Sequence, residues 1–216
     1  MILNHADNRG YDYPLIRSKN KLLLWVAGAL ILENIFQFGY FLGLRADVIT
    51  SCCGTLFSQD TRSISGDMAS FSSYWTRILF YLGVVLTLRA GIHFLATGRG
   101  AGVFSLFASG MMVLGLISVV SFISVYYYEL PTHHCPFCIL QKEYHYIGYP
   151  LYLSLLLAGV TGAGVGAMER LKGPDSLREV TPGFQRRLTL VSLISLLAFT
   201  GIAAYPMVFS DFILET

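Results

Sequence analysis

The chain has 216 residues, of which 54% are hydrophobic and only 13% are charged. Soluble domains carry about 25% charged residues, so this composition excludes an ordinary soluble globule and indicates an integral membrane protein. The formal net charge is only +2, and the basic residues form no stripe on a polar domain, which argues against nucleic acid as a partner.

Five apolar segments follow one another along the chain, each close to the roughly 20 residues that cross a bilayer core as a helix. They predict an all-α integral membrane protein, a bundle of about five transmembrane helices in a single membrane domain over residues 1–216. The expected spans are 22–43, 78–96, 103–128, 146–168 and 188–209. We expect no cleavable signal peptide, because residues 1–21 are polar and no small-residue cleavage site follows the first apolar run.

The distribution of lysine and arginine predicts the orientation, since these residues favour the cytoplasmic side of a membrane. With the N-terminus inside, the outer segments hold only Arg45, Arg62, Arg77 and Lys142 of the 15 cations. The inner segments hold all the others: Arg9, Arg17, Lys19, Lys21, Arg89, Arg99, Arg170, Lys172, Arg178, Arg186 and Arg187. We therefore expect an inner N-terminus, an outer C-terminus, and all four cysteines on the outer side, where disulfides form and persist.

Residues 130–142 carry two cysteines, Cys135 and Cys138, with two residues between them. Such a pair binds a metal, cycles between dithiol and disulfide, or closes a turn. Pro136 suits the first turn of a helix, so the pattern predicts a helix start that leads into the fourth span. A cysteine at a helix start lies near unpaired N–H groups, which favour a reactive thiolate. His133 and His134 before the pair would add positive charge if they are protonated, and Lys142 lies one to two turns further on.

Two other interpretations of this segment stay open. His134, Cys135 and Cys138 together suit a structural metal site, and the two cysteines alone suit a structural disulfide. The second thiol pair, Cys52-Cys53, is vicinal. A disulfide between adjacent residues is strained, and strain makes a disulfide more oxidising. The same adjacent thiols also suit a soft metal such as Hg(II) or Cu(I).

Residues 135–142, which read Cys-Pro-Phe-Cys-Ile-Leu-Gln-Lys, resemble the Cys-Pro-x-Cys-x-x-Gln-Arg signature of the bacterial disulfide bond formation protein B family. The order of the two pairs, one after the first span and one before the fourth, resembles the vitamin K epoxide reductase family. Lys142 stands where the signature has arginine, and Cys52 and Cys53 are adjacent where that family separates its loop thiols. The resemblance implies a bacterial inner-membrane protein that passes electrons between a separate periplasmic thioredoxin-like protein and quinone.

The leading hypothesis is therefore a quinone-linked thiol–disulfide oxidoreductase, with an N-terminus in the cytoplasm and a C-terminus in the periplasm. Its catalytic residues would be Cys52, Cys53, Cys135 and Cys138. Electrons would pass from the loop pair to Cys135–Cys138, and Cys138 would reduce ubiquinone or menaquinone. The residues expected to bind the quinone are Lys142, Gln141, Tyr144 and His134. No haem is expected, because His93 has no second histidine at a matching depth.

Two rival functions come from other classes. The first is capture or transport of a soft metal (Hg, Cu or Zn) by Cys52, Cys53, His134, Cys135 and Cys138. The second is an accessory subunit of a membrane electron-transfer complex, in which the cysteines are structural. Glu33 in the middle of the first span is a further candidate, because ionisable groups inside a membrane are often functional. It would relay protons, face a partner subunit, or form a hydrogen-bonded pair with Asn34.

Overall fold

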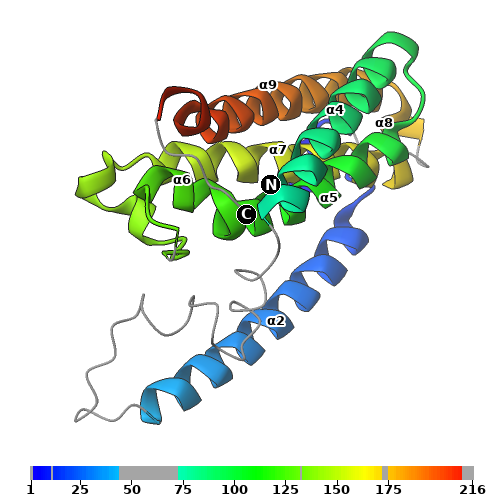
Figure 1. The fold of residues 1–216 in the computed structure, drawn as a ribbon. Coiled ribbons are helices and arrows are strands. Elements are labelled where there is room, and N and C mark those ends of the chain that lie inside the picture. Colours follow the sequence, from blue (N-terminus) through cyan, green and yellow to red (C-terminus); the bar gives the residue numbers. More distant parts are fainter. Residues whose placement is uncertain (1, 11, 44–72, 132, 172–174, 211–216) are drawn as a thin grey trace. The chain divides into compact units, whose positions relative to one another are not determined.

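The computed structural model describes residues 2–10, 12–43, 73–131, 133–171 and 175–210 (Figure 1). Regular structure in these ranges is helical throughout, without a strand, which confirms the predicted all-α fold class. Five helices are long and apolar enough to cross a membrane, so the chain is a multi-pass membrane protein. They are α2 (Ile16–Leu42), α4 (Ser73–Thr97), a continuous helix over Ala101–Tyr128, α7 (Gly148–Leu171) and α9 (Val180–Phe209).

Each predicted span lies largely on one of these helices, but the helices extend beyond the apolar stretches. Hydropathy marks the part of a helix that suits lipid, whereas the backbone hydrogen bonds continue into polar residues at either end. The largest difference is in α9, which begins at Val180 rather than at residue 188. Pro182 does not prevent this early start, because the first-turn amides of a helix lack an intrahelical partner in any case.

The chain divides into two compact units, residues 1–50 with 170–184, and residues 51–169 with 185–216. In the first unit, α1 (Ile2–Asp7) packs on the start of α2 through Asp7. The buried Asp7 carboxylate accepts a 2.7 Å hydrogen bond from the amide of Leu15 and forms an ion pair with Lys19. Burial disfavours the charge on Asp7, but the Lys19 and Leu15 contacts outweigh burial and lower the pKa of this carboxyl. The earlier expectation of a single membrane domain stays a prediction.

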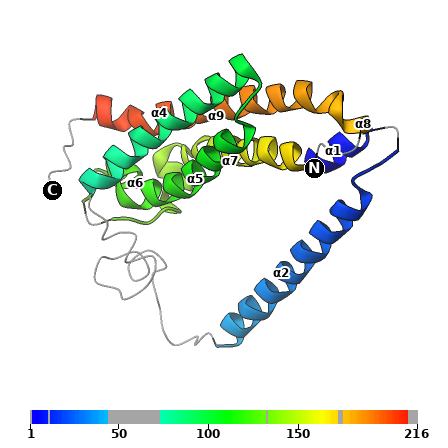
Figure 2. The same cartoon turned by 90° about the vertical axis from the view of Figure 1, so that its right-hand side faces the viewer.

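The second unit contains four of the long helices, with α4 packed along α5 (Ala101–Ser118) (Figures 1 and 2). Hydrogen bonds from Gln185 to the carbonyl of Val165 and from Ser192 to the carbonyl of Ala158 join α9 to α7. Glycines allow the close approaches. A Cβ atom on Gly162 would lie 2.3 Å from the Cβ of Ala108 and 3.0 Å from Ser192 Oγ. Small residues at such contacts let transmembrane helices pack backbone to backbone.

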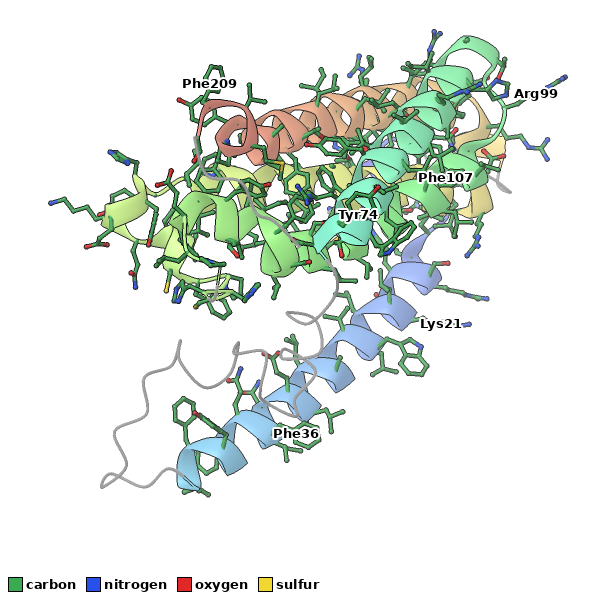
Figure 3. All side chains as sticks on the ribbon, in the orientation of Figure 1. Lys21, Phe36, Tyr74, Arg99, Phe107 and Phe209 are labelled. Atoms are coloured by element: carbon green, nitrogen blue, oxygen red, sulfur yellow. The ribbon has the colours of Figure 1, made fainter. Side chains whose placement is uncertain are left out.

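A core of aromatic side chains fills the middle of this unit. The ring of Phe80 on α4 meets the rings of Phe122 and Phe199 edge-on, at centroid distances of 5.7 and 5.9 Å, and all three side chains are fully buried. The same core cluster includes Cys135 and Cys138. Figure 3 places Arg99, at the turn from α4 to α5, and Phe209, at the end of α9, at opposite ends of the unit. Because Cys135 and Cys138 belong to the buried core cluster, they lie in the packed interior of this unit rather than in a separate surface loop.

Candidate functional site

The third transmembrane helix contains one turn of π-helix, η1 (Val119–Ile123), between α5 and α6 (Ser124–Tyr128). In this wider turn the amide of Ser124 bonds to the carbonyl of Val119, five residues back, and bypasses the carbonyl of Val120. The imidazole Nδ1 of His134 lies 3.0 Å from that Val120 oxygen. A carbonyl can only accept a hydrogen bond, so Nδ1 carries the proton. The buried His134 thereby joins the segment before Cys135 to the third helix.

Two tyrosines hold the backbone of the Cys-Pro-Phe-Cys turn. The hydroxyl of Tyr128, the last residue of α6, donates a 2.5 Å hydrogen bond to the carbonyl of Cys135. The hydroxyl of Tyr152 on α7 donates a 2.6 Å bond to the carbonyl of Pro136. The turn is thus fixed between two transmembrane helices by bonds to consecutive carbonyl groups.

The sequence-based prediction of a helix start at this motif is wrong. Residues Cys138–Leu140 form only a three-residue 3-10 turn (η2), Lys142–Tyr144 form another (η3), and α7 begins at Gly148. In an α-helix the carbonyls of Cys135 and Pro136 would accept from amides four residues further on, but here the tyrosine hydroxyls bind them. No extended helix dipole is therefore present to favour a thiolate at Cys135.

Both cysteines are buried, with exposed fractions of 1% for Cys135 and 8% for Cys138. Phe137, between them, is 62% exposed. A large protein partner cannot reach a side chain that is this buried unless the turn opens. A small or lipid-soluble reactant needs only a cavity beside the turn.

Such a cavity adjoins the site. A cleft of about 600 Å³ lies at the end of the second unit and is lined by Tyr127, Glu143, Tyr144, His145, Ile147, Gly201, Ile202 and Tyr205. This volume is in the usual range for small-molecule sites. Tyr144 connects the cleft to the thiol turn, because its ring packs on Tyr128 at a centroid distance of 4.7 Å. Burial raises the pKa of Tyr144, and the nearby Cys138 and Glu143 raise it further, so this phenol remains a hydrogen-bond donor.

A left-handed backbone conformation occurs at the cleft-lining His145, and two more occur close to cleft-lining residues in the chain. His145 and Tyr146 follow one another with φ of 54° and 57°, and Glu129 at the end of α6 has φ of 53°. Side chains other than glycine seldom adopt these angles, and such strain concentrates at functional sites. The hydroxyl of Ser210 donates a 2.7 Å bond to the carboxylate of Glu129, which holds the end of α9 against the end of α6.

The other predicted quinone-binding residues are placed differently from Tyr144. Gln141 and Lys142 have exposed side chains beside the cleft-lining residues of η3. His134 is buried and bonded to the third helix. The predicted catalytic residues Cys52 and Cys53 lie outside the described residues.

Metal binding and the role of Glu33 were the remaining open points. Within the described ranges, no group of three or more His, Cys, Asp or Glu side chains is placed to hold a metal ion. The alternative soft-metal site, which also includes Cys52 and Cys53, stays a prediction. Glu33 accepts a 3.0 Å hydrogen bond from Gln37, one helical turn away, whereas Asn34 donates to the carbonyl of Leu30. Of the three alternatives for Glu33, the hydrogen-bonded pair with Asn34 is not formed, because residues four apart share a helix face and adjacent ones do not. Proton relay and contact with a partner subunit stay predictions.

Sequence reasoning did not single out Tyr152 or Tyr205 for these positions, or the π-helical turn. Tyrosines at the ends of transmembrane helices look the same in sequence whether they anchor a turn or only sit at the lipid–water interface. Comparisons with protein-family models, with curated proteins and with solved structures return no match to this chain. The site is therefore interpreted from its own geometry.

Proposed function

We propose that this protein is a quinone-linked thiol–disulfide oxidoreductase of the bacterial inner membrane, with its N-terminus in the cytoplasm and its C-terminus in the periplasm. One observation carries the proposal. The buried Cys135–Cys138 turn is linked to a cleft of about 600 Å³ through two tyrosines: Tyr144 lines the cleft, and its ring packs on Tyr128, which holds the Cys135 carbonyl. A redox-active thiol pair beside a small-molecule cleft suits electron transfer to a small acceptor better than it suits a purely structural bridge.

The cleft suits a quinone headgroup in shape and in chemistry. Three tyrosine rings supply flat apolar surfaces, and the hydroxyls of Tyr144 and Tyr205 and the imidazole of His145 can donate hydrogen bonds to carbonyl oxygens. The hydroxyl of Tyr127 already donates to the carbonyl of Ile202. A bound quinone would supply an acceptor for two electrons and two protons. Oxidation of the Cys135 and Cys138 thiols to one disulfide releases two electrons and two protons, so the reaction balances without another reactant. Lys142, on the same 3-10 turn as Tyr144, adds a positive charge near the cleft.

The first half of the cycle would use the other thiol pair. A periplasmic thioredoxin-like dithiol reduces a Cys52–Cys53 disulfide and is itself oxidised. The resulting loop dithiol then reduces a Cys135–Cys138 disulfide by exchange. Because Cys135 and Cys138 are buried, this exchange requires the turn to open before a loop thiol can attack.

The proposal is tested by measuring quinone reduction in nanodiscs. The purified chain is supplied with dithiothreitol and a short-chain ubiquinone or menaquinone analogue, and quinone absorbance is followed. We expect turnover in the wild type and none in Cys138→Ser. Tyr144→Ala should raise the KM for quinone, whereas Tyr149→Ala, whose side chain is 61% exposed and lies outside the cleft lining, should leave KM unchanged.

Two results would contradict the proposal. Turnover that is equal in the wild type and in Cys138→Ser would show that the thiols do not carry the electrons. Purified protein that holds about one Zn, Cu or Hg ion per chain, with all four thiols reduced, would favour metal capture instead.

The exchange step has a separate test. Cys138→Ser removes the thiol that would resolve a mixed disulfide on Cys135, so a crosslink from Cys135 to Cys52 or Cys53 should accumulate under oxidising conditions. Non-reducing peptide mapping detects it, and Cys135→Ser serves as the matched control without the crosslink. Absence of the crosslink in folded Cys138→Ser protein would rule out the shuttle between the two pairs.

A further inference from the structure

The π-helical turn in the third transmembrane helix has no role in the proposed function so far. In a regular α-helix the Val120 carbonyl would accept a hydrogen bond from the amide of Ser124. In the π-helical turn that amide bonds to the carbonyl of Val119 instead. The hydroxyl of Ser124 does not replace that amide, since this buried oxygen has no hydrogen-bond partner among the described residues. The side chain that does bond to Val120 is His134, at 3.0 Å.

We propose that His134 is a positioning residue for the Cys135–Cys138 pair, and that the π-helical turn provides the carbonyl that holds it. The inference rests on the proposed redox role of the two cysteines. His134 immediately precedes Cys135, and its ring is only 4% exposed. Together with the hydroxyl of Tyr128 on the Cys135 carbonyl, the bond to Val120 fixes this cysteine from both sides.

Such positioning acts on the equilibrium between dithiol and disulfide. A disulfide forms only within a narrow range of geometries, and held thiols have a high effective concentration for each other. Loss of the His134 bond would free the reduced turn more than the oxidised turn, because the disulfide itself still constrains the oxidised form. Disulfide formation would then become less favourable.

Two substitutions of His134 separate the effect of its hydrogen bond to Val120 from the other effects of the imidazole ring. The amide nitrogen of asparagine lies as many bonds from Cα as the Nδ1 of histidine, so His134→Asn can keep the donation to Val120. The amide nitrogen of glutamine lies one bond further out, so His134→Gln loses that donation. His133→Asn is the matched control, since the ring of His133 packs on Tyr128 at 4.8 Å and is not buried.

The test is a redox titration of the Cys135–Cys138 pair in the full chain, in nanodiscs, with Cys52 and Cys53 replaced by alanine. Glutathione or dithiothreitol buffers set the potential, and mass spectrometry after alkylation counts the reduced thiols. We expect His134→Gln to lower the equilibrium constant for disulfide formation about tenfold, or about 30 mV for this two-electron couple. His134→Asn and His133→Asn should stay within about twofold of the wild type.

Each possible result supports or overturns the positioning role of His134. An unchanged constant in folded His134→Gln protein, or a tenfold change in His134→Asn or His133→Asn, overturns the positioning role while quinone reduction can still hold. If His134→Gln does not fold, His134→Asn decides alone: it must fold and keep the wild-type constant. A wild-type pair that forms no disulfide in any buffer would overturn this inference and the proposed redox function together, whereas intact titration without quinone turnover would overturn only the latter.

Discussion

The tyrosine hydroxyls that hold the cysteine turn give the most direct test of the site. Tyr128→Phe removes the 2.5 Å hydrogen bond to the carbonyl of Cys135, a residue with an exposed fraction of only 1%. Water cannot replace the lost donor there, so the carbonyl remains unsatisfied at a cost of about 1–3 kcal/mol. Tyr152→Phe affects Pro136, which is only partly buried. Water reaches this carbonyl more easily, so the cost is about 0.5–1.5 kcal/mol.

These costs favour opening of the turn and can be measured as thiol reactivity. A small reagent such as methyl methanethiosulfonate reacts with Cys135 only while the turn is open, so the rate follows the population of the open state. Each 1.4 kcal/mol changes that population tenfold. Tyr128→Phe should therefore raise the rate roughly 5- to 150-fold, and Tyr152→Phe roughly 2- to 12-fold. Mass spectrometry of the Cys135 peptide gives the rates.

The control is Tyr149→Phe on the same helix as Tyr152, since the Tyr149 side chain is 61% exposed. Its rate should equal that of the wild type. The reasoning is refuted if Tyr128→Phe reacts no faster than the wild type. It is also refuted if Tyr149→Phe accelerates the reaction as much as Tyr128→Phe does, because the effect would then come from the loss of any phenol.

Further predictions concern the packing of the helices and the N-terminal unit. Ser124→Ala should stabilise the protein by about 1 kcal/mol, because it removes a buried hydroxyl without a partner among the described residues. A lower thermal unfolding temperature in detergent than that of the wild type would contradict this. Gly162→Ala should destabilise by about 1–3 kcal/mol, since its Cβ would lie 2.3 Å from a neighbouring Cβ. Gly110→Ala, with nothing within 4 Å of the new Cβ, should be neutral or stabilising by up to about 1 kcal/mol, and equal losses in both variants would show that no close helix contact exists at Gly162. The lowered pKa of Asp7 means that its contribution to stability is present at neutral pH and is lost as the pH falls below about 4 and through the folded-state pKa. The protection of the Leu15 amide against hydrogen exchange, measured relative to an unstructured amide at the same pH, should decrease over that range. In Asp7→Asn this protection should be low already at neutral pH and should not decrease further on acidification.

The five transmembrane helices could be predicted from the sequence because a bilayer leaves few choices. A chain in lipid must satisfy every backbone hydrogen bond internally, so a long apolar segment has to be helical. The same rule explains why the helix ends could not be predicted. Outside the lipid the constraint no longer applies, and α9 continues back to Val180 through residues that hydropathy counts as a polar loop.

The cysteine motif shows where local sequence rules reach their limit. Pro136 after Cys135 is a valid signal for a helix start, yet the turn is only three residues of 3-10 helix. The decisive partners are the hydroxyl of Tyr152, on the next transmembrane helix, and that of Tyr128, on the preceding one. Neither tyrosine differs in sequence from an ordinary interfacial aromatic residue.

Composition and spacing alone thus determined that this is a helical membrane protein with a pair of nearby thiols before its fourth span. Only the tertiary structure decided that these cysteines are buried, that the Val120 carbonyl in a π-helical turn receives His134, and that a cleft lies behind Tyr144. The physical reason is the range of the interactions. Hydrophobic burial in lipid acts on each segment by itself, whereas a hydrogen bond between a side chain and a distant carbonyl exists only once two helices have packed.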